Sequence, residues 1–277
     1  MSTFFVTGAN SGIGRALVEA LAARGATIIL ATRSEARTKP VLADLRARYP
    51  DARLQWLHLD VSDLGAVRRV AQSFLATKQP IDVLVNNAGV AGTRRLSADG
   101  FDITYATNHI GPFLLTQLLL PRLQEAPQGR VVNVASNAHF TAKWLDWSGL
   151  ERRTAPRRSG FKDYAVTKLM NVLHAKELAR RLSGTRVTTY SLHPGAVASN
   201  IWRAVPWPVR PIIKLFMISN EKGAETPLYC ATAPELAKTT GRYYYKNREA
   251  KTSPLGQDAA LARELWEKTE LLVNASR

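Results

Sequence analysis

The sequence predicts one α/β domain, 1–277, built on a doubly wound, mainly parallel β-sheet with helices on both faces. Short apolar runs alternate with stretches whose apolar residues recur every three or four positions, which indicates strands alternating with amphipathic helices. The runs are rich in Val, Ile and Leu, as in parallel strands that are buried on both faces. No internal repeat or low-complexity linker divides the chain, and 277 residues of 45% hydrophobic content suffice for one substantial core.

The short apolar runs are the expected strands, about seven in number and parallel because helical segments separate them. They are Thr3–Thr7, Thr27–Thr32, Leu54–Leu59, Ile81–Asn86, Gly129–Ser136, Arg186–Leu192 and Gly241–Tyr245.

Helical spacing is clearest in four segments between these strands. They are Ile13–Arg24, Leu64–Ala76, Phe101–Leu123 and Tyr164–Leu182. Two other segments interrupt the alternation: 140–162 is polar and arginine-rich, and about 199–220 mixes Trp and Phe with prolines. Both follow the C-terminal ends of expected strands, where open α/β sheets bind ligands. We interpret 140–162 as an insertion beside the site and 199–220 as an apolar lid over the substrate.

The strongly basic composition bears on the class of partner. The net charge is +16, from 38 basic and 22 acidic residues. The basic residues are spread along the chain, and neither zinc-finger spacing nor a basic heptad region occurs, so a solvated surface is favoured and no nucleic-acid partner is expected. Peripheral membrane contact stays an alternative for Trp202–Ile218, where tryptophans mix with basic residues.

Targeting and redox signals are few. No stretch approaches 18 uninterrupted apolar residues and no leader pattern opens the chain, so neither a transmembrane helix nor export is expected. The single cysteine, Cys230, cannot form an intrachain disulfide and is interpreted as a buried small hydrophobe. The five histidines lack metal-ligand spacing, so no metal is expected. A reducing cytoplasmic location fits these features.

A glycine-rich turn follows the first strand. It reads Thr7-Gly8-Ala9-Asn10-Ser11-Gly12-Ile13-Gly14, and a helix comes next. Gly8 suits the tight turn, Gly12 lets the backbone approach a pyrophosphate, and Gly14 lets the helix pack close to the sheet. The helix N-terminus then offers free N–H groups to the phosphates. Strand, turn and helix in this order predict a Rossmann-like nucleotide-binding site that includes Asn10, Ser11 and Ile13.

Tyr164 and Lys168 lie four residues apart in an expected helix, so their side chains share one face. A nearby cation favours the phenolate, and Lys168 is therefore predicted to lower the pKa of Tyr164 from about 10 toward neutrality. Such a tyrosine would serve as a general acid or base. The spacing alone is common by chance, so its weight depends on the other motifs.

Together with the Gly-xxx-Gly-x-Gly turn, the Tyr164–Lys168 pair resembles the short-chain dehydrogenase/reductase family. The resemblance covers nearly the whole chain, and its further motifs occur in family order. They are Asp60-Val61, Asn86-Asn87-Ala88-Gly89, Asn108, Ser136 and Pro194-Gly195.

The resemblance implies a role for each matching residue. Tyr164 would be the general acid/base, Ser136 would donate a hydrogen bond to the substrate oxygen, and Lys168 would hold the nicotinamide ribose. Asn108 would help to hold a water that links Lys168 to solvent. The cofactor contacts implied beyond the glycine turn are Asp60 and Val61 at the adenine, Asn87, Ala88 and Gly89 at the adenosine, and Pro194, Gly195, Val197 and Ser199 near the nicotinamide.

The end of the second expected strand indicates which nicotinamide cofactor is bound. An acidic residue there would bind the ribose hydroxyls of NAD, but the sequence is Ala31-Thr32-Arg33-Ser34. Arg33, with help from Arg37, can instead pair with a 2′-phosphate. NADP(H) is therefore the predicted cofactor.

The substrate is predicted to be a hydrophobic aldehyde, ketone or alcohol. The run Tyr164–Asn171, the run Leu192–Gly195 and the tail around Ser253-Pro254 and Leu265-Trp266 resemble the retinol dehydrogenase branch of the family. A steroid or other polycyclic dehydrogenase and a non-catalytic NADP(H) sensor or scaffold stay open as alternatives. His139, close after Ser136, is interpreted as structural, with a place beside the substrate as the alternative. Because family members often assemble through long helices, a homodimer or homotetramer is also expected.

Overall fold

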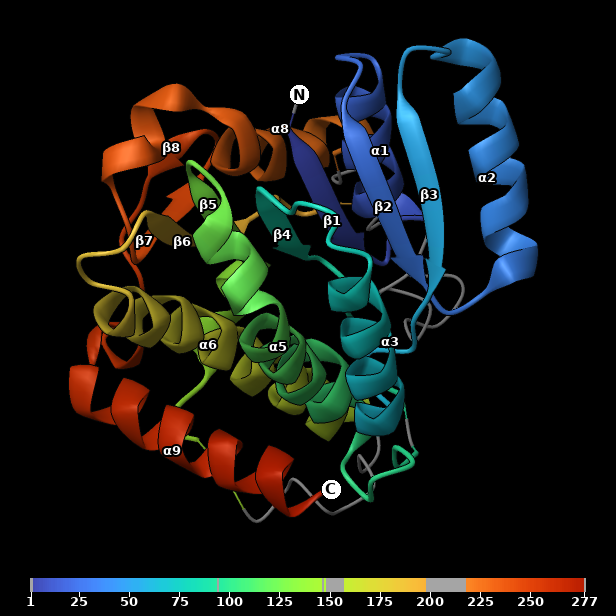
Figure 1. The fold of residues 1–277 in the computed structure, drawn as a ribbon. Helices are drawn as coiled ribbons and strands as arrows, with labels where there is room; N and C mark the ends of the chain where they lie inside the picture. Colours follow the sequence, from blue (N-terminus) through green and yellow to red (C-terminus); the bar gives the residue numbers. More distant parts are fainter. Residues whose placement is uncertain (1, 94, 146, 148–156, 198–217, 277) are drawn as a thin grey trace.

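A β-sheet runs through the centre of the molecule (Figure 1). The computed structural model describes residues 2–93, 95–145, 147, 157–197 and 218–276. Within these residues the sheet has eight strands in the order β3-β2-β1-β4-β5-β6-β7-β8. They are β1 (Thr3–Thr7), β2 (Thr27–Thr32), β3 (Arg53–His58), β4 (Val83–Asn86), β5 (Gly129–Val134), β6 (Val187–His193), β7 (Arg242–Tyr245) and β8 (Arg248–Glu249).

The seven predicted strands are confirmed, and they pair with one another in parallel. The two-residue β8 was not predicted, and it pairs antiparallel with β7. Lys246 and Asn247 join the two strands, with φ of 51° and 58°. Positive φ at both central residues is the geometry of a tight hairpin turn. The usual Asn-Gly or Asp-Gly signal is absent here, which explains why the sequence did not reveal the turn.

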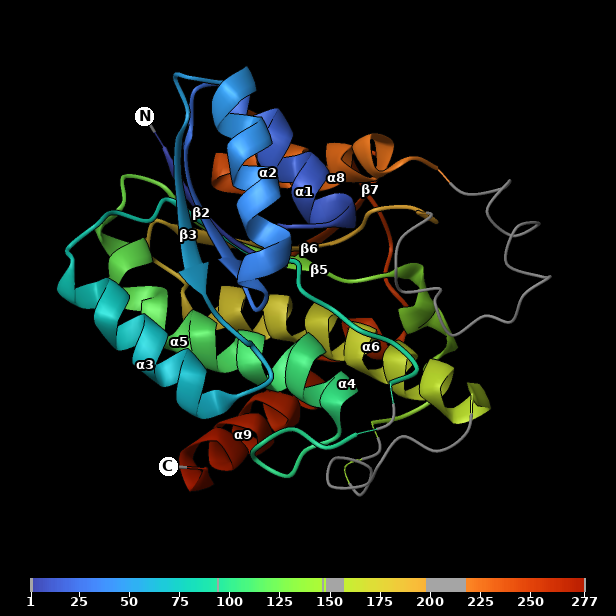
Figure 2. The ribbon, with the colours of Figure 1, turned by 90° about the vertical axis from the view of Figure 1, so that its right-hand side faces the viewer.

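Helices cover both faces of the sheet, as predicted (Figures 1 and 2). On one face lie α1 (Gly12–Ala22), α2 (Glu35–Arg48) and α8 (Asn220–Thr232). On the other lie α3 (Leu64–Ala76), α5 (Gly111–Glu125) and α6 (Arg157–Arg181), with α9 (Ala259–Ala275) packed outside α5 and α6. The fold is thus a three-layer α/β/α arrangement with one extra helix.

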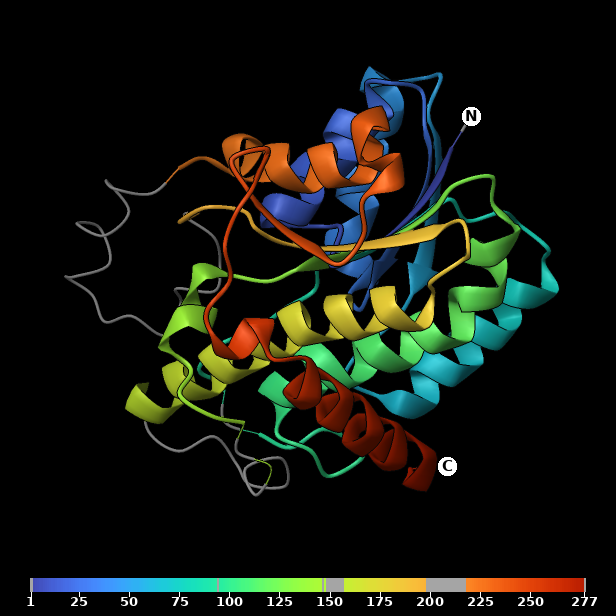
Figure 3. The ribbon, with the colours of Figure 1, turned by 90° about the vertical axis from the view of Figure 1, so that its left-hand side faces the viewer.

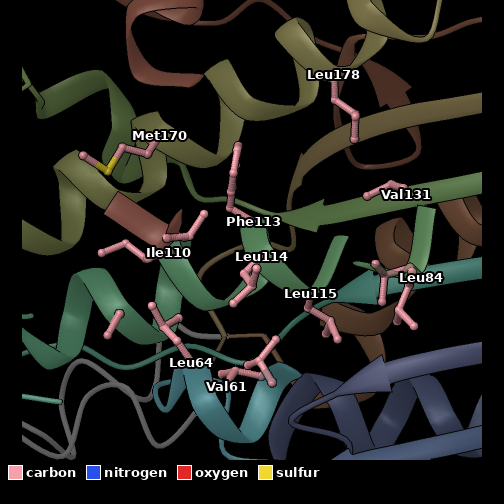
Figure 4. Packing of buried hydrophobic residues seen from close by; sticks show 14 of the residues in the cluster. Val61, Leu64, Leu84, Ile110, Phe113, Leu114, Leu115, Val131, Met170 and Leu178 are labelled. Atoms are coloured by element: carbon pink, nitrogen blue, oxygen red, sulfur yellow. The ribbon is translucent and has the colours of Figure 1, made fainter. Parts of the chain in front are cut away.

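Each face of the sheet has its own hydrophobic core. Phe5, Leu84 and Val131 point from the strands toward α3, α5 and α6, and Figure 4 shows Leu84 and Val131 among the side chains that fill this layer. Val6, Leu30 and Val132 point to the opposite face, toward α1, α2 and α8. Neighbouring residues of β1 and β5 therefore belong to different cores, as the alternation of side chains along a strand requires.

The expected helix over Phe101–Leu123 is interrupted. It begins as α4 (Ile103–Tyr105), widens into a π-turn, η1 (Ala106–Ile110), and continues as α5. A Cβ placed on Gly111 would lie 1.7 Å from the Val61 carbonyl oxygen, so only glycine allows this approach of helix and loop. Widened turns of this kind often occur at functional sites.

Trp266, which is 4% exposed, packs the C-terminal helix α9 against the rest of the domain. Its ring lies edge-on to Phe113 of α5 at 4.9 Å, and the Arg181 guanidinium of α6 lies 4.4 Å from the ring centroid. Part of the outer surface of α5 and α6 is therefore covered by the chain's own helix (Figure 3). Assembly through these long helices stays a prediction.

Replacing Trp266 by Ala is expected to lower the free energy of unfolding by about 3–5 kcal/mol, because a large cavity would open between α5, α6 and α9. Denaturant unfolding measures the change. Leu271→Ala on the same helix is the control: Leu271 is 70% exposed, and a change within about 0.5 kcal/mol is expected. A loss of less than about 1 kcal/mol for Trp266→Ala would show that the docking of α9 is unimportant for stability.

Two predicted segments fall partly outside the described residues. The insertion 140–162 is described at 140–145, 147 and 157–162, and the lid 199–220 only at 218–220. Among the described helices, none is both long enough and apolar enough to cross a bilayer.

Candidate active site

A cleft of about 390 Å³ opens where β1, β2, β3 and β4 end at their carboxyl edge. This is the ligand-binding edge of an open α/β sheet. Many of its lining residues were predicted as cofactor contacts: Gly8, Asn10, Ser11, Gly12, Ile13, Gly14, Arg33, Arg37, Asp60, Val61, Asn87, Ala88 and Gly89. The structure thus brings together residues that are up to 81 positions apart in the chain.

The glycine turn has the geometry that its sequence predicted. Gly8 and Gly12 have φ of 65° and 55°, which L side chains rarely adopt. A Cβ on Gly14 would lie 2.4 Å from the Gly8 carbonyl oxygen and 2.5 Å from Asn87 Nδ2. The N-terminus of α1 therefore sits directly against the turn, where its free N–H groups face the cleft and suit an anionic phosphate.

Thr7 holds this turn to the next strand, and the sequence analysis did not single it out. Its Oγ1 accepts hydrogen bonds from the backbone N–H groups of Asn87 and Ala88, both at 3.0 Å. In return, Asn87 Nδ2 donates to the Thr7 carbonyl oxygen at 2.8 Å. These hydrogen bonds join the carboxyl ends of the adjacent strands β1 and β4 beside the cleft. Its position directly before Gly8 was the signal that could have identified it.

Arg33 and Asp60 face each other at the end of the cleft that lies beside the carboxyl ends of β2 and β3. Arg33 donates to Asp60 Oδ2 at 3.3 Å, and the other carboxylate oxygen accepts from the Ser62 hydroxyl at 2.6 Å. The Asp60 pKa is lowered, since these hydrogen bonds and the Arg33 charge together outweigh the effect of burial, which is the largest single influence and acts in the opposite direction. Arg37 lines the same end of the cleft. The guanidinium groups of Arg33 and Arg37 and the hydrogen-bonded carboxylate of Asp60 therefore surround the carboxyl end of β2.

Ser136, Tyr164 and Lys168 converge beyond the other end of the cleft. Ser136 follows β5, and its hydroxyl is hydrogen-bonded to the Tyr164 side chain of α6. Lys168 Nζ lies 5.4 Å from the centre of the Tyr164 ring and donates to the Val134 carbonyl oxygen at 2.7 Å. A Cβ on Gly89 would lie 3.7 Å from Lys168 Nζ, which places the cleft next to this group.

The pKa of Tyr164 differs from the prediction. Burial raises it to about 12, against the opposing effect of the Ser136 hydrogen bond. Burial also lowers the pKa of Lys168 to about 8. The Lys168 ammonium lies over the ring and binds the Val134 carbonyl, so its charge does not overcome the loss of water around the phenol. The predicted lowering of the Tyr164 pKa by Lys168 is therefore wrong.

Asn108 lies in the π-turn η1 and is 1% exposed. Its side-chain amide accepts from Val90 N at 2.8 Å and donates to Val90 O and to Thr167 Oγ1, both at 3.0 Å. It thus braces the loop after β4 against α6, one residue before Lys168. The predicted water between Asn108 and Lys168 stays a prediction.

The segment after β6 lies beside the glycine turn. Ile218 pairs with Val197, and Ile218 N donates to the Ala196 carbonyl oxygen at 2.9 Å. A Cβ on Gly223 of α8 would meet both Val197 and Ile13 of the glycine turn. Pro194, Gly195 and Val197 do not line the described cleft, so their predicted cofactor contacts stay predictions, and Ser199 lies outside the described residues.

Some lining residues were not predicted. They are Ala31, Thr32, Leu59, Val90, Ala91, Thr93 and Thr107. Thr32, Leu59 and Val90 directly adjoin a predicted contact in the chain, and that adjacency was the available signal for these three. Thr107 differs, because the π-turn brings it to the cleft together with Asn108.

Comparison with known proteins gives a consistent result. The family model described as "short chain dehydrogenase" matches residues 2–146, which is more than half of the chain. The human protein "Dehydrogenase/reductase SDR family member 13" is 40% identical over 275 residues, covering 98% of this chain and 72% of its own. Human "Retinol dehydrogenase 12" is 37% identical over 267 residues, covering 94% of this chain and 83% of its own.

Among solved structures, an uncharacterised protein from Mycobacterium paratuberculosis superposes with a TM-score of 0.78 at 32% identity. The match covers 99% of this chain and 94% of that one. The relatives share identity over most of their length, and the structural match extends over the whole fold. The chain therefore belongs to the short-chain dehydrogenase/reductase family.

Proposed function

We propose that the protein is an NADP(H)-dependent oxidoreductase that interconverts hydrophobic aldehydes or ketones and their alcohols, with Tyr164 as general acid and base. The observation that carries this proposal is the convergence of Ser136, Tyr164 and Lys168 at the end of a nucleotide-sized cleft. A carbonyl beside the Ser136 and Tyr164 hydroxyls would lie within reach of a nicotinamide ring held in that cleft.

The residues present suit the cofactor, since the Gly8–Gly14 turn leaves no room for side chains where phosphates would approach. When bound, the nicotinamide supplies the hydride, and the protein supplies position and electrostatics. Tyr164 donates its proton to the carbonyl oxygen in reduction and withdraws it in oxidation, while Ser136 donates a hydrogen bond to the same oxygen. A phenol whose pKa lies near 12 is protonated at neutral pH, which suits the role of acid in reduction, whereas the role of base in oxidation needs a lower pKa.

The preference for NADP(H) rests on the charges where β2 ends. Arg33 and Arg37 are exposed and line the cleft, and Arg33 can form a two-pronged contact with a 2′-phosphate. The two residues directly after β2 are Arg33 and Ser34, so no carboxylate stands there to bind the ribose hydroxyls of NAD. Glu35 follows in α2 and pairs with Lys39. Asp60 follows the next strand, β3, and is already bound by Ser62 and Arg33.

Arg33→Ala is expected to weaken NADPH binding by about 10- to 100-fold, because a charge-assisted hydrogen bond is lost. NADH binding should change by less than about threefold, since NADH has no 2′-phosphate. Fluorescence titration of the reduced cofactor measures both dissociation constants. Arg53→Ala removes an exposed arginine at the other end of β3 and is the control for net charge. Equal weakening of the two cofactors by Arg33→Ala would contradict the assignment.

Exposed aromatic residues in the segments that follow Ser136 and precede Tyr164 in the chain support an apolar substrate. Phe140, Trp144 and Phe161 are 51%, 63% and 48% exposed, although they are large hydrophobic residues. The Phe161 ring lies 6.4 Å from that of Tyr164, and Phe140 lies in the short helix η2 (Asn137–Thr141) that follows Ser136. One relative is named for retinol, an apolar alcohol. A hydrophobic carbonyl compound could cover these rings when bound.

A carbonyl panel tests the proposal. NADPH consumption would be followed with aliphatic, aromatic, retinoid and steroid aldehydes or ketones. We expect turnover with apolar members and none with small polar ones. A clear preference for steroids would favour the polycyclic alternative. Saturable NADPH binding without turnover of any member would instead favour a sensor or scaffold and would contradict the proposed activity.

A further inference from the structure

The short helix η2 places His139 directly behind the catalytic serine. His139 is fully buried, so it does not border the substrate. Its backbone N–H donates to the Ser136 carbonyl oxygen at 3.1 Å, and its ring Nδ1 lies 2.7 Å from the same oxygen. A carbonyl oxygen only accepts hydrogen bonds, so Nδ1 carries a proton. One residue thus binds the Ser136 carbonyl twice.

The other ring nitrogen of His139 reaches a distant part of the chain. The backbone N–H of Ser253, in the segment before α9, donates to Nε2 at 3.1 Å. An N–H group only donates, so Nε2 carries no proton. The two contacts together define the tautomer: a neutral ring with Nδ1 protonated and Nε2 bare. The ring thus connects the loop that carries Ser136 with the segment 252–257. The two bonded residues, His139 and Ser253, are 114 positions apart in the chain.

Aromatic neighbours hold the His139 ring in this orientation. Phe140 lies 4.2 Å from it between ring centroids, and Tyr243 of β7 lies edge-on at 5.0 Å. The Tyr243 hydroxyl in turn donates to Asn137 Oδ1 at 2.9 Å, next to Ser136. On the opposite side, the Ser253 hydroxyl accepts from Gly256 N at 3.1 Å, which fixes the donor that His139 needs.

We propose that His139 is a positioning residue that fixes the backbone of Ser136, and so aims the Ser136 hydroxyl at Tyr164, only while its ring is neutral with the proton on Nδ1. This inference rests on the proposed function, since it assigns a purpose to the orientation of Ser136. It adds a link that the reaction itself does not require: the segment before α9 sets the tautomer of a histidine in the catalytic loop.

Protonation of His139 would break the arrangement. Nε2 would then carry a hydrogen that faces the N–H of Ser253. Within the part of the chain that the structure describes, the ionisable neighbours offer no negative charge to the buried ring: His193 of β6 is a base and Tyr243 of β7 is a neutral phenol. Beyond them lie Lys168 next to His193 and Tyr164 next to Tyr243, a base and a neutral phenol. Burial accordingly lowers the His139 pKa, although the bond to Ser136 opposes this. The neutral ring therefore persists through neutral pH.

Two substitutions separate the parts of this role. His139→Phe keeps an aromatic ring and the backbone N–H bond to Ser136, but it loses both hydrogen bonds of the imidazole ring. We expect it to lower kcat by about 100-fold, the cost of misplacing a reacting group slightly, with the NADPH dissociation constant unchanged because the glycine turn is remote. His139→Asn keeps a donor in the place of Nδ1, and kcat should recover to within about 10-fold of the wild type. Turnover would be measured with 4-nitrobenzaldehyde or with the best member of the panel.

Nitrogen NMR of protein labelled at histidine reads the tautomer directly, and His139→Asn assigns the signal by its disappearance. We expect a protonated Nδ1 and a bare Nε2 at neutral pH, with no titration near the ordinary histidine pKa. An Nε2-protonated ring, an ordinary titration, or an undiminished kcat in His139→Phe would each overturn the inference. If His139→Phe fails to fold, the NMR result and the kcat of His139→Asn decide.

The failure of this inference is distinguishable from failure of the proposed function. Turnover by the wild type together with an Nε2-protonated His139 would leave the function standing and reject the positioning role. No turnover with any carbonyl would reject the function, whatever the NMR spectrum shows.

Discussion

Tyr164→Phe is expected to lower kcat for carbonyl reduction by about 10³-fold, within the range measured for positioned general acids. The substitution removes one oxygen and keeps the ring that packs between Phe161 and Lys168. Without the phenol no acid remains in contact with the Ser136 hydroxyl, so the developing negative charge on the substrate oxygen would have only that one donor. The NADPH dissociation constant should change by less than about threefold, because the cleft is lined by other residues.

Tyr190→Phe is a matched control for this substitution. Tyr190 is also fully buried and also loses a bonded hydroxyl, which donates to the Leu236 carbonyl oxygen at 2.6 Å. It belongs to the core on the α1, α2 and α8 face of the sheet, away from Ser136. Its kcat should stay within about threefold of wild type. Comparable turnover by Tyr164→Phe and the wild type would exclude Tyr164 as the acid.

Loss of the Lys168 charge is expected to have the second largest effect. Lys168→Met should lower kcat/KM by about 10²–10³-fold, a loss comparable to that of one electrostatic group in an active site, because it removes the cation beside Tyr164 that is expected to hold the nicotinamide ribose. Lys168 is 3% exposed, and its ammonium donates to the Val134 carbonyl oxygen at 2.7 Å. Water at this buried position would not supply the electrostatic stabilisation that the ammonium gives. Lys176→Met on the same helix is the control, since Lys176 is only half-buried and lies two turns further along.

The pH dependence provides an independent test of Lys168. Its pKa is lowered to about 8, so the side chain is an ammonium below that pH and a neutral amine above it. Since Lys168 is expected to hold the nicotinamide ribose as an ammonium, kcat/KM for NADPH, which reports the free enzyme, should fall as the pH rises through about 8. Tyr164 titrates near 12 and does not contribute in this window. Initial rates between about pH 6 and pH 10 would show the decline, and a flat profile would contradict it.

The Tyr164–Lys168 pair illustrates how far sequence reasoning reaches. Spacing of four residues correctly put both side chains on one face of α6. The sign of the pKa change was nevertheless wrong, because a pKa depends on burial, and burial is set by β5, η1 and η2 packing around the pair. A motif identifies the ionisable groups, whereas their pKa values depend on all the residues that exclude water from them.

Asn108 shows a similar division. Its place in the order of motifs identified it, but its contacts depend on the π-turn that carries it and on Gly111, where the helix touches the Val61 carbonyl. Hydrophobic periodicity cannot distinguish one widened turn from a regular helix over so short a stretch. The brace between Val90 and Thr167 therefore became visible only in three dimensions.

The sequence by itself determined the order of strands and helices, the parallel sheet, the glycine turn and the family, because these depend on local periodicity and on short-range motifs. Only the tertiary structure decided the pKa values at the site, the Arg33–Asp60 pair, the docking of Trp266 and the bridge from Ser136 through His139 to Ser253. The physical reason is that each of these features joins residues that are remote in the chain. The interaction energy depends on the distance between the groups and on the exclusion of water, and no single segment of the sequence determines either of them.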